Sequence, residues 1–218
     1  MNEIIILQNN NIIEQKQLKL THKKFTPDYL SKLYTPYKDK KHTLQSITKS
    51  IVSLLYGIAI ENKHIKLDNL DNKIYNFFTN YKLDKNIKIK HLLNMTSGIN
   101  WQMDEDYDST NNATYQMEHS EDWIEFIMNS KMKYKPGKHF QYKDCDTVLL
   151  GYIFYKLTKL KVDEYAEKYL FKKLKISAYW NKAYDNYPDP EGGLYMDSKS
   201  LLEIGKLILN NGNYPLTA

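Results

Sequence analysis

Residues 43–61, TLQSITKSIVSLLYGIAIE, form the longest apolar helical pattern in this 218-residue chain. Apolar side chains recur there at the i, i+3, i+4 and i+7 spacing of a helix, at Ile47, Ile51, Leu54, Leu55, Ile58 and Ala59. Val52 widens the apolar stripe, which is typical of a buried helix rather than a surface helix. Threonine is a favoured residue at helix starts. The stretch therefore predicts a long buried helix that begins with Thr43 as its cap.

Two polar residues, Ser46 and Lys49, lie near the start of this predicted helix, three residues apart and therefore on one face. A serine hydroxyl is a poor nucleophile until a nearby base takes its proton, and a lysine can be that base only if its own pKa is lowered. Burial lowers the pKa of a lysine, and so does the positive end of a helix dipole. The pair is a candidate catalytic dyad, with a chance spacing as the alternative.

The same Ser-x-x-Lys spacing occurs once more, at Ser130 and Lys133. In a chain this rich in lysine, chance alone predicts about one or two such spacings. Ser130 precedes a segment of alternating lysines that is broken by Pro136-Gly137, which is typical of a solvated helix end or loop. Only Ser46 opens a long apolar helix, so the context favours Ser46.

The composition restricts the class of protein. A hydrophobic content of 42% with 13% aromatic residues is typical of a folded globular chain, and this length is most simply one domain. The net charge is +5, yet all 31 basic residues are lysines, and they are scattered among 26 acidic residues. A nucleic-acid-binding protein is expected to carry a basic patch with arginines. We therefore expect no nucleic-acid partner.

Sequence motifs for metals and cofactors are missing. The single cysteine, Cys145, excludes an internal disulfide and a Cys-x-x-Cys metal site, and we interpret it as a small buried side chain. The six histidines form no His-x-x-x-His pair, and no phosphate-binding or dinucleotide-binding glycine loop is present. We expect no cofactor and no metal.

The start of the sequence, MNEIIILQNN, lacks the basic and apolar regions of a secretory signal. No apolar run reaches the length of about 18 residues that a membrane span needs. As written, the chain is therefore expected to be cytoplasmic, without a membrane segment.

Local patterns predict the order of the other elements. Short β-branched runs at 3–7 and 12–15, separated by asparagines that tolerate positive φ, predict an N-terminal hairpin. Residues 16–42 are polar, are broken by prolines and lead into the central helix. Beyond it, helical patterns occur at 65–78, 91–95, 121–129, 144–159, 162–175 and 197–211, with loops at 104–120 and 185–193. Gly98 and Gly212 are expected to end helices in the left-handed conformation.

A hairpin followed only by helices is an incomplete arrangement. Two strands alone are marginally stable and present unpaired edges, so further strands are expected to complete the sheet. We therefore interpret residues 1–218 as one incomplete domain. It consists of a hairpin and lead-in at 1–42 and a mainly helical part at 43–212, with the C-terminal strands missing.

Four segments together resemble the serine β-lactamase and penicillin-binding-protein superfamily: HTLQSITKSIVSLLYGIAIE, IKIKHLLNMTSGINW, PGKHFQYKDCDTVLLGYIF and EGGLYMDSKSLLEIGKLILNNGNY. They are most similar to the branch of class C β-lactamases, DD-peptidases, esterases and 6-aminohexanoate-dimer hydrolases. The run from Thr96 to Trp101 looks most like the esterase and dimer-hydrolase members. The resemblance extends from about Glu3 to Tyr214. It implies an α/β (α+β) fold, a helical subdomain with an antiparallel sheet of which only the N-terminal hairpin is present.

The resemblance implies a role for each residue that matches a motif. Ser46 and Lys49 match S-x-x-K, so Ser46 would form an acyl-enzyme while Lys49 assists proton transfer. Tyr142 matches the tyrosine of Y-x-N, which is thought to act as general base and then as acid to the leaving group. Asp144, a candidate substrate-binding residue, stands where that motif has Asn. A carboxylate cannot donate an amide N–H, which weakens a β-lactam-specific reading more than it weakens hydrolysis.

Trp101 and Gly193 are the other candidate substrate-binding residues. Trp101 can line the pocket or only pack beneath it, and both alternatives remain open. Gly192 and Gly193 resemble the family's glycine pair near the active site, with an ordinary turn as the alternative. His42 and Lys143 are expected to face solvent.

The resemblance implies a serine hydrolase that acts through an acyl-enzyme on a small-molecule ester, amide or β-lactam. The backbone N–H of Ser46 would supply half of the oxyanion hole. The third family motif, K-[ST]-G or H-x-G, would lie on a strand after Tyr214 and is absent, and the loss of one oxyanion donor costs about 3–4 kcal/mol. Activity is therefore expected to be impaired. The alternative is a catalytically inactive remnant that binds a ligand or partner. Full-length relatives are often exported.

Overall fold

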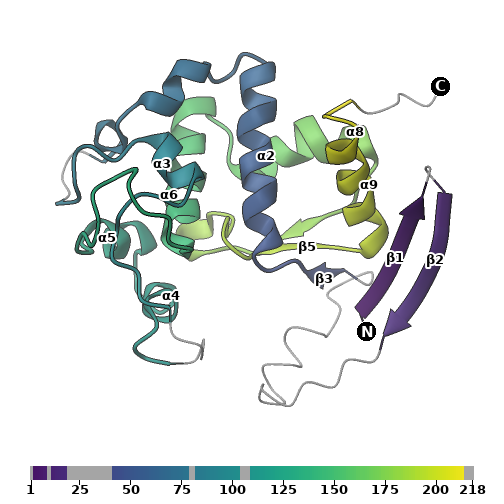
Figure 1. Cartoon of the computed structure of the whole chain (residues 1–218), viewed down its shortest axis with the longest axis horizontal. Coiled ribbons are helices and arrows are strands. Elements are labelled where there is room, and N and C mark those ends of the chain that lie inside the picture. Colours follow the sequence, from purple (N-terminus) through teal and green to yellow (C-terminus); the bar gives the residue numbers. More distant parts are fainter. Residues whose placement is uncertain (1, 9–10, 19–40, 79–81, 104–108, 214–218) are drawn as a thin grey trace.

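The structure is a computed structural model that describes residues 2–8, 11–18, 41–78, 82–103 and 109–213. Its centre is α2 (Ile47–Glu61), which stands between α3 and α6 on one side and α8 and α9 on the other (Figure 1). The apolar face of α2 is buried, as the periodicity predicts, and includes Ile51, Val52, Leu55, Tyr56 and Ala59.

The predicted start of this helix is wrong by a few residues. Ser46, not Thr43, occupies the N-cap position of α2, and the Ser46 side chain makes no capping hydrogen bond. Gln45 has φ of 47°, a left-handed conformation that interrupts a helix before Ser46. Thr43 instead belongs to strand β3 (His42–Thr43), where it pairs with Tyr195. Ser46 thus lies at the sharp junction between a strand and the central helix.

The other helices follow the predicted order. They are α3 (Ile89–Leu93), α4 (Ala113–Glu118), α5 (Trp123–Met128), α6 (Asp144–Thr158), α7 (Val162–Ala166), α8 (Lys172–Leu174) and α9 (Ser198–Leu209). The π-helical turn η4 (Glu167–Phe171) joins α7 to α8, and the 3-10 turns are η2 (Leu67–Asp71), η3 (Ile74–Asn76) and η5 (Tyr184–Asn186). Asp197 caps α9 through the Ser200 N–H, and Gly212 follows with φ of 82°.

Two sequence interpretations need correction here. The segment 65–78 forms two short 3-10 turns instead of one α-helix, and the Asn69 side chain accepts the Lys66 N–H at the start of the first turn. The segment 104–120, expected to be a loop, contains α4. Asn112 caps that helix by accepting from the N–H groups of Thr114 and Tyr115, and residues 104–108 lie outside the described residues.

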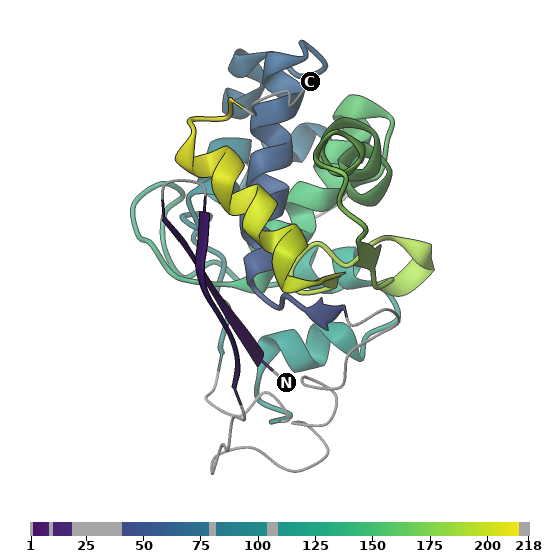
Figure 2. The same ribbon diagram turned by 90° about the vertical axis from the view of Figure 1, so that its right-hand side faces the viewer.

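Two small antiparallel sheets complete the fold. Strands β1 (Asn2–Gln8) and β2 (Asn11–Leu18) form the predicted hairpin, and α9 packs beside β1 (Figure 2). A second sheet has the order β3-β5-β4, with β4 (Tyr179–Trp180) and β5 (Leu194–Met196). These very short strands lack a readable alternation, so the sequence did not predict them. The expected mixed fold, a helical part with antiparallel strands, is confirmed.

The packing of α2 against α6 forms the core beneath the site. The Tyr56 hydroxyl donates to the Leu150 carbonyl at 2.9 Å, and the Tyr56 ring meets Phe154 edge-on at 5.1 Å between centroids. This contact fixes the two helices side by side, which brings the start of α6 close to the first turn of α2. Within the described residues, no helix is both long and apolar enough to cross a membrane.

Glycines 98 and 57 provide a matched test of the fold. Gly98 has φ of 82°, and a Cβ there would overlap the Tyr134 carbonyl oxygen. We expect Gly98→Ala to lower the free energy of unfolding by about 2 kcal/mol or more. Gly57 lies within α2 with open space around it, so Gly57→Ala is expected to raise stability by about 0.5–1 kcal/mol. Urea denaturation of both variants measures the difference, and equal changes would contradict this account.

Candidate active site

The ammonium group of Lys49 lies at the centre of the candidate site. Its Nζ donates to Ser46 Oγ at 3.0 Å, because one helical turn places the two residues on the same face of α2. Asp144 Oδ1 lies 2.7 Å from the same nitrogen. Glu191 supplies two further acceptors, its backbone carbonyl at 2.7 Å and Oε2 at 3.0 Å. Lys49 is therefore buried among oxygen acceptors that come from three parts of the chain.

Asp144 is held in place by a chain of hydrogen bonds. It begins α6, and only 1% of its surface is exposed. Thr114 Oγ1 donates to Asp144 Oδ2 at 2.5 Å and accepts from Trp101 Nε1 at 3.1 Å. Trp101 is fully buried, so it packs beneath the site and orients Asp144 through Thr114. This finding places Trp101 in a supporting position and not in an open pocket.

The turn at residues 188–193 positions Glu191. Asp189 Oδ1 accepts from the N–H groups of Glu191 at 2.9 Å and Gly192 at 3.2 Å, and the Trp180 indole donates to the Asp189 carbonyl. A Cβ at Gly193 would lie 2.7 Å from the Asp189 Cβ, so this turn requires glycine there. Gly193 thus shapes the turn that presents Glu191.

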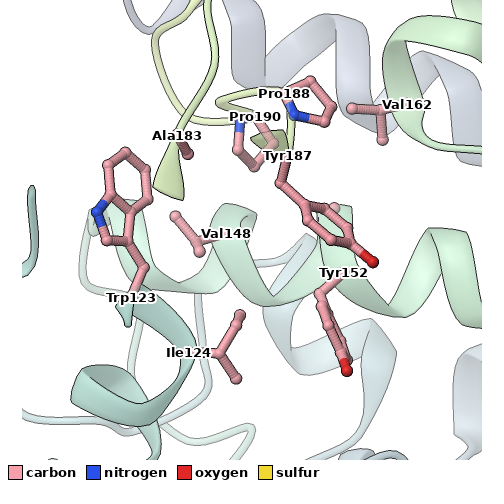
Figure 3. Close-up of a pocket in the computed structure, with 10 residues that line it drawn as sticks. Trp123, Ile124, Val148, Tyr152, Val162, Ala183, Tyr187, Pro188 and Pro190 are labelled. Carbon is pink, nitrogen blue, oxygen red and sulfur yellow. The ribbon is translucent and has the colours of Figure 1, made fainter. Parts of the chain in front are cut away.

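The same turn is seated on α6. A Cβ on Gly151 would lie 2.9 Å from the Pro190 side chain, so the missing side chain lets Pro190 approach the helix. Figure 3 shows Pro188 and Pro190 beside Val148 in an apolar pocket that Trp123 and Tyr187 also line. The candidate catalytic residues do not line this pocket. The pocket affects the site only through Pro190, which packs on α6 and directly precedes Glu191 in the chain.

Charges control the protonation state of Lys49. Burial alone lowers the pKa of Lys49, but the nearby charges of Glu191 and Asp144 outweigh it and raise the pKa above its ordinary value. Burial also raises the pKa of Glu191, Asp189 and Glu118, and the crowding of these carboxyl groups adds to the effect. The lowered pKa expected for a lysine base is therefore not found. Lys49 is an ammonium ion in this arrangement.

Ser46 and Tyr142 form the accessible side of the site. Ser46 is half-buried, and no acceptor for its backbone N–H occurs among the described residues, so this N–H can serve as an oxyanion donor. The Tyr142 ring is 40% exposed, and its centroid lies 5.4 Å from Lys49 Nζ. Ser46 and Tyr142 are therefore both accessible to solvent, on either side of Lys49 in its contacts.

The structure brings Ser46, Lys49, Tyr142 and Asp144 together. Sequence reasoning missed Glu191, Glu118 and Thr114. Glu191 directly precedes the glycine pair, but nothing in the local sequence indicates that it contacts a lysine 142 residues away. In the described part of the chain, no three His, Cys, Asp or Glu side chains are arranged to hold a metal ion.

A second buried polar cluster lies behind the site and corrects the expectation that Lys143 faces solvent. Lys143 is fully buried, and its Nζ donates to the Ile99 carbonyl at 3.1 Å and to Ser97 Oγ at 3.4 Å. Burial raises the pKa of Asp146 to about 7, although the nearby Lys143 charge and Ser97 oppose this. Lys143 is buried instead of exposed because its ammonium group has oxygen acceptors, and a lysine can be buried when such acceptors surround it. His42 is half-buried, not fully solvent-facing, and Cys145 is buried as expected.

Comparisons with known proteins place this arrangement in a wider group. The Beta-lactamase family model matches residues 26–205. "Protein flp" of Staphylococcus aureus (strain MRSA252) is 30% identical over 127 residues, which cover 57% of this chain and 25% of that protein. The chain therefore spans about a quarter of the length of this curated relative.

Solved structures show the same fold. A "Putative 6-aminohexanoate-dimer hydrolase from Bacillus anthracis" superposes with a TM-score of 0.73 at 15% identity, covering 97% of this chain and 54% of that one. An octameric penicillin-binding protein homologue from Pyrococcus abyssi gives a TM-score of 0.66 at 20% identity, covering 97% and 52%. At these identities the likeness shows the fold alone.

Proposed function

Because the chain belongs to the Beta-lactamase family, whose members are serine hydrolases, we propose that it is an acyl-transfer serine hydrolase with Ser46 as nucleophile. The observation that carries the proposal is the hydrogen bond of 3.0 Å between Lys49 Nζ and Ser46 Oγ at the start of α2. The substrate is a small molecule with an ester, amide or β-lactam carbonyl. The exposed ring of Tyr142 borders the space in which that carbonyl would bind.

The reaction has two steps. Ser46 Oγ bonds to the acyl carbon and loses its proton to a base, and the bond to the leaving group breaks as that group takes up a proton. Water then attacks the acyl-enzyme, which releases the acid and restores the serine hydroxyl. The Ser46 N–H donates to the carbonyl oxygen as its negative charge develops. Tyr142 is the candidate for moving the proton, because it adjoins Lys49 and is open to the substrate.

A second candidate function is a catalytically inactive relative that retains the fold. The contacts of Lys49 favour it, because a lysine held as an ammonium ion has no lone pair with which to accept the Ser46 proton. On this alternative the chain binds a small molecule or a partner without turning it over. Covalent labelling of Ser46 separates the two functions.

We expect a fluorophosphonate or a fluorescent penicillin to form one covalent adduct with the purified protein, as measured by intact mass. The adduct should be absent from Ser46→Ala and retained in Ser130→Ala, which removes the serine of the other Ser-x-x-Lys spacing. A folded protein, judged by circular dichroism, that forms no adduct with either reagent would contradict the proposed function and support the inactive alternative.

A further inference from the structure

Glu191 contacts Lys49 through two oxygens, one from its backbone and one from its side chain. An ammonium group has three N–H donors, and Lys49 Nζ donates to three oxygens, the Glu191 carbonyl, Glu191 Oε2 and Ser46 Oγ. Asp144 Oδ1 lies 2.7 Å from the same nitrogen as an ion-pair partner. The Glu191 and Asp144 oxygens can only accept. A neutral amine has two N–H donors and a lone pair that would take the Ser46 hydroxyl proton, so it would leave one of these three oxygens without an N–H. The surroundings therefore fit the ammonium form and disfavour the neutral base.

We propose that Glu191 is a positioning residue that clamps Lys49 as an ammonium ion and keeps the Ser46–Lys49 pair in a resting state. The inference rests on the proposed function of Ser46. Release of the Glu191 carboxylate from Lys49 would lower the pKa of the ammonium group, so that a larger fraction of Lys49 has lost its proton to solvent and can take the proton of Ser46. Glu191 thereby limits how fast Ser46 becomes a nucleophile.

The clamp has two parts, the backbone carbonyl and the side-chain carboxylate of Glu191. The Glu191 carbonyl is fixed, because Asp189 holds the turn and Pro190 packs on Gly151 of α6. The Glu191 side chain contacts Lys49 and also interacts with Glu118 of α4. The side chain is therefore the half that a substitution can remove, because the backbone contact of Glu191 with Lys49 stays in place without it.

Every charged group that faces Lys49 bears on this clamp. Asp144 approaches Lys49 from the start of α6, and Glu191 and Asp189 approach it from the turn, while Glu118 of α4 contacts Glu191. The Tyr142 ring covers the open side. Burial and the neighbouring carboxyl groups raise the pKa of Glu191, and the charge and hydrogen bond of Lys49 oppose that rise and favour the carboxylate. Asp144 stays in place when Glu191 is replaced, so the clamp should be weakened and not abolished.

The test is the titration of Lys49 in Glu191→Gln, followed by NMR of lysine side chains labelled with carbon-13 at Cε. The Lys49 signal is assigned by its loss in Lys49→Met. We expect the midpoint to fall by about one pH unit or more, which is tenfold more neutral amine at a given pH. The matched control is Glu203→Gln, which removes a carboxylate paired with Lys206 at 2.7 Å on α9 and should leave Lys49 unchanged.

Glu191→Ala provides a second variant that keeps the backbone acceptor, and circular dichroism checks that each variant is folded. An unchanged Lys49 midpoint in the folded Glu191 variants would overturn the clamp. The rate of Ser46 labelling by a fluorophosphonate is measured alongside and is expected to rise about tenfold with the fall in midpoint. If the midpoint falls and no variant is labelled, the clamp stands and the proposed function fails. If the Lys49 midpoint is unchanged and Ser46 is labelled, the clamp is overturned and the proposed function of Ser46 is supported.

Discussion

Asp144→Asn is expected to speed the labelling of Ser46 by a fluorophosphonate about 10- to 100-fold near neutral pH. Asp144 Oδ1 lies 2.7 Å from Lys49 Nζ in a site where both side chains are almost fully buried. An opposite charge at such a distance shifts a pKa by about one to three units, so its removal lowers the pKa of Lys49 and enlarges the neutral fraction. The amide oxygen can still accept the Thr114 hydroxyl, and its N–H becomes available to a substrate carbonyl.

The labelling rate of Asp144→Asn should be measured across pH 6–10, with Asp163→Asn as the control. Asp163 pairs with Lys182 on the surface, so that variant loses a carboxylate in an ion pair remote from Ser46. An unchanged or lower rate in folded Asp144→Asn would show that the Asp144 charge does not restrain Ser46. The wild-type rate is expected to rise with pH throughout this range, since a lysine with a raised pKa stays protonated until high pH.

Lys143→Met is expected to lower the free energy of unfolding by about 3–5 kcal/mol at pH 8, because it leaves the buried Asp146 carboxylate without its counter-charge. The effect should be smaller at pH 5. Asp146 has a pKa of about 7 in the folded protein against an ordinary value of 3.8, so the folded state keeps this carboxyl neutral at the lower pH. The folded protein binds the extra proton, and stability therefore falls as the pH rises from about 4 to 7.

Urea denaturation at pH 5 and pH 8 measures the effect of Lys143→Met. Lys138→Met, at an exposed lysine of the preceding loop, is the matched control and is expected to change stability by less than about 0.5 kcal/mol. A similar small change for both variants at both pH values would mean that the buried Lys143 does not compensate the charge of Asp146.

The parts of the fold that the sequence predicted are those whose signals are local. Periodicity located α2 and α6, and the Asp197 cap and Gly212 bounded α9. The Ser-x-x-Lys spacing placed Ser46 and Lys49 on one helical face, where the structure also has them. Each of these features depends on residues within a few turns of one another.

The features that the sequence did not predict depend on distant partners. The burial of Lys143 depends on acceptors supplied by Ser97 and Ile99, and the raised pKa of Lys49 depends on the charges of Glu191 and Asp144. No local pattern reports which acceptors surround a buried lysine. Only the folded arrangement shows that acidic groups surround Lys49 and raise its pKa.

A hydrogen bond between β5 and the first turn of α2 links residues that are synthesised at very different times. The Leu194 N–H donates to Thr48 Oγ1, a contact between residues 146 positions apart. Closing a loop of this length carries a large entropy cost, so such contacts form late in folding. During translation, Ser46 and Lys49 therefore leave the ribosome long before Glu191 has been made. The Ser46 hydroxyl and the Lys49 amine are therefore synthesised well before the Glu191 oxygens that contact Lys49 in the folded protein.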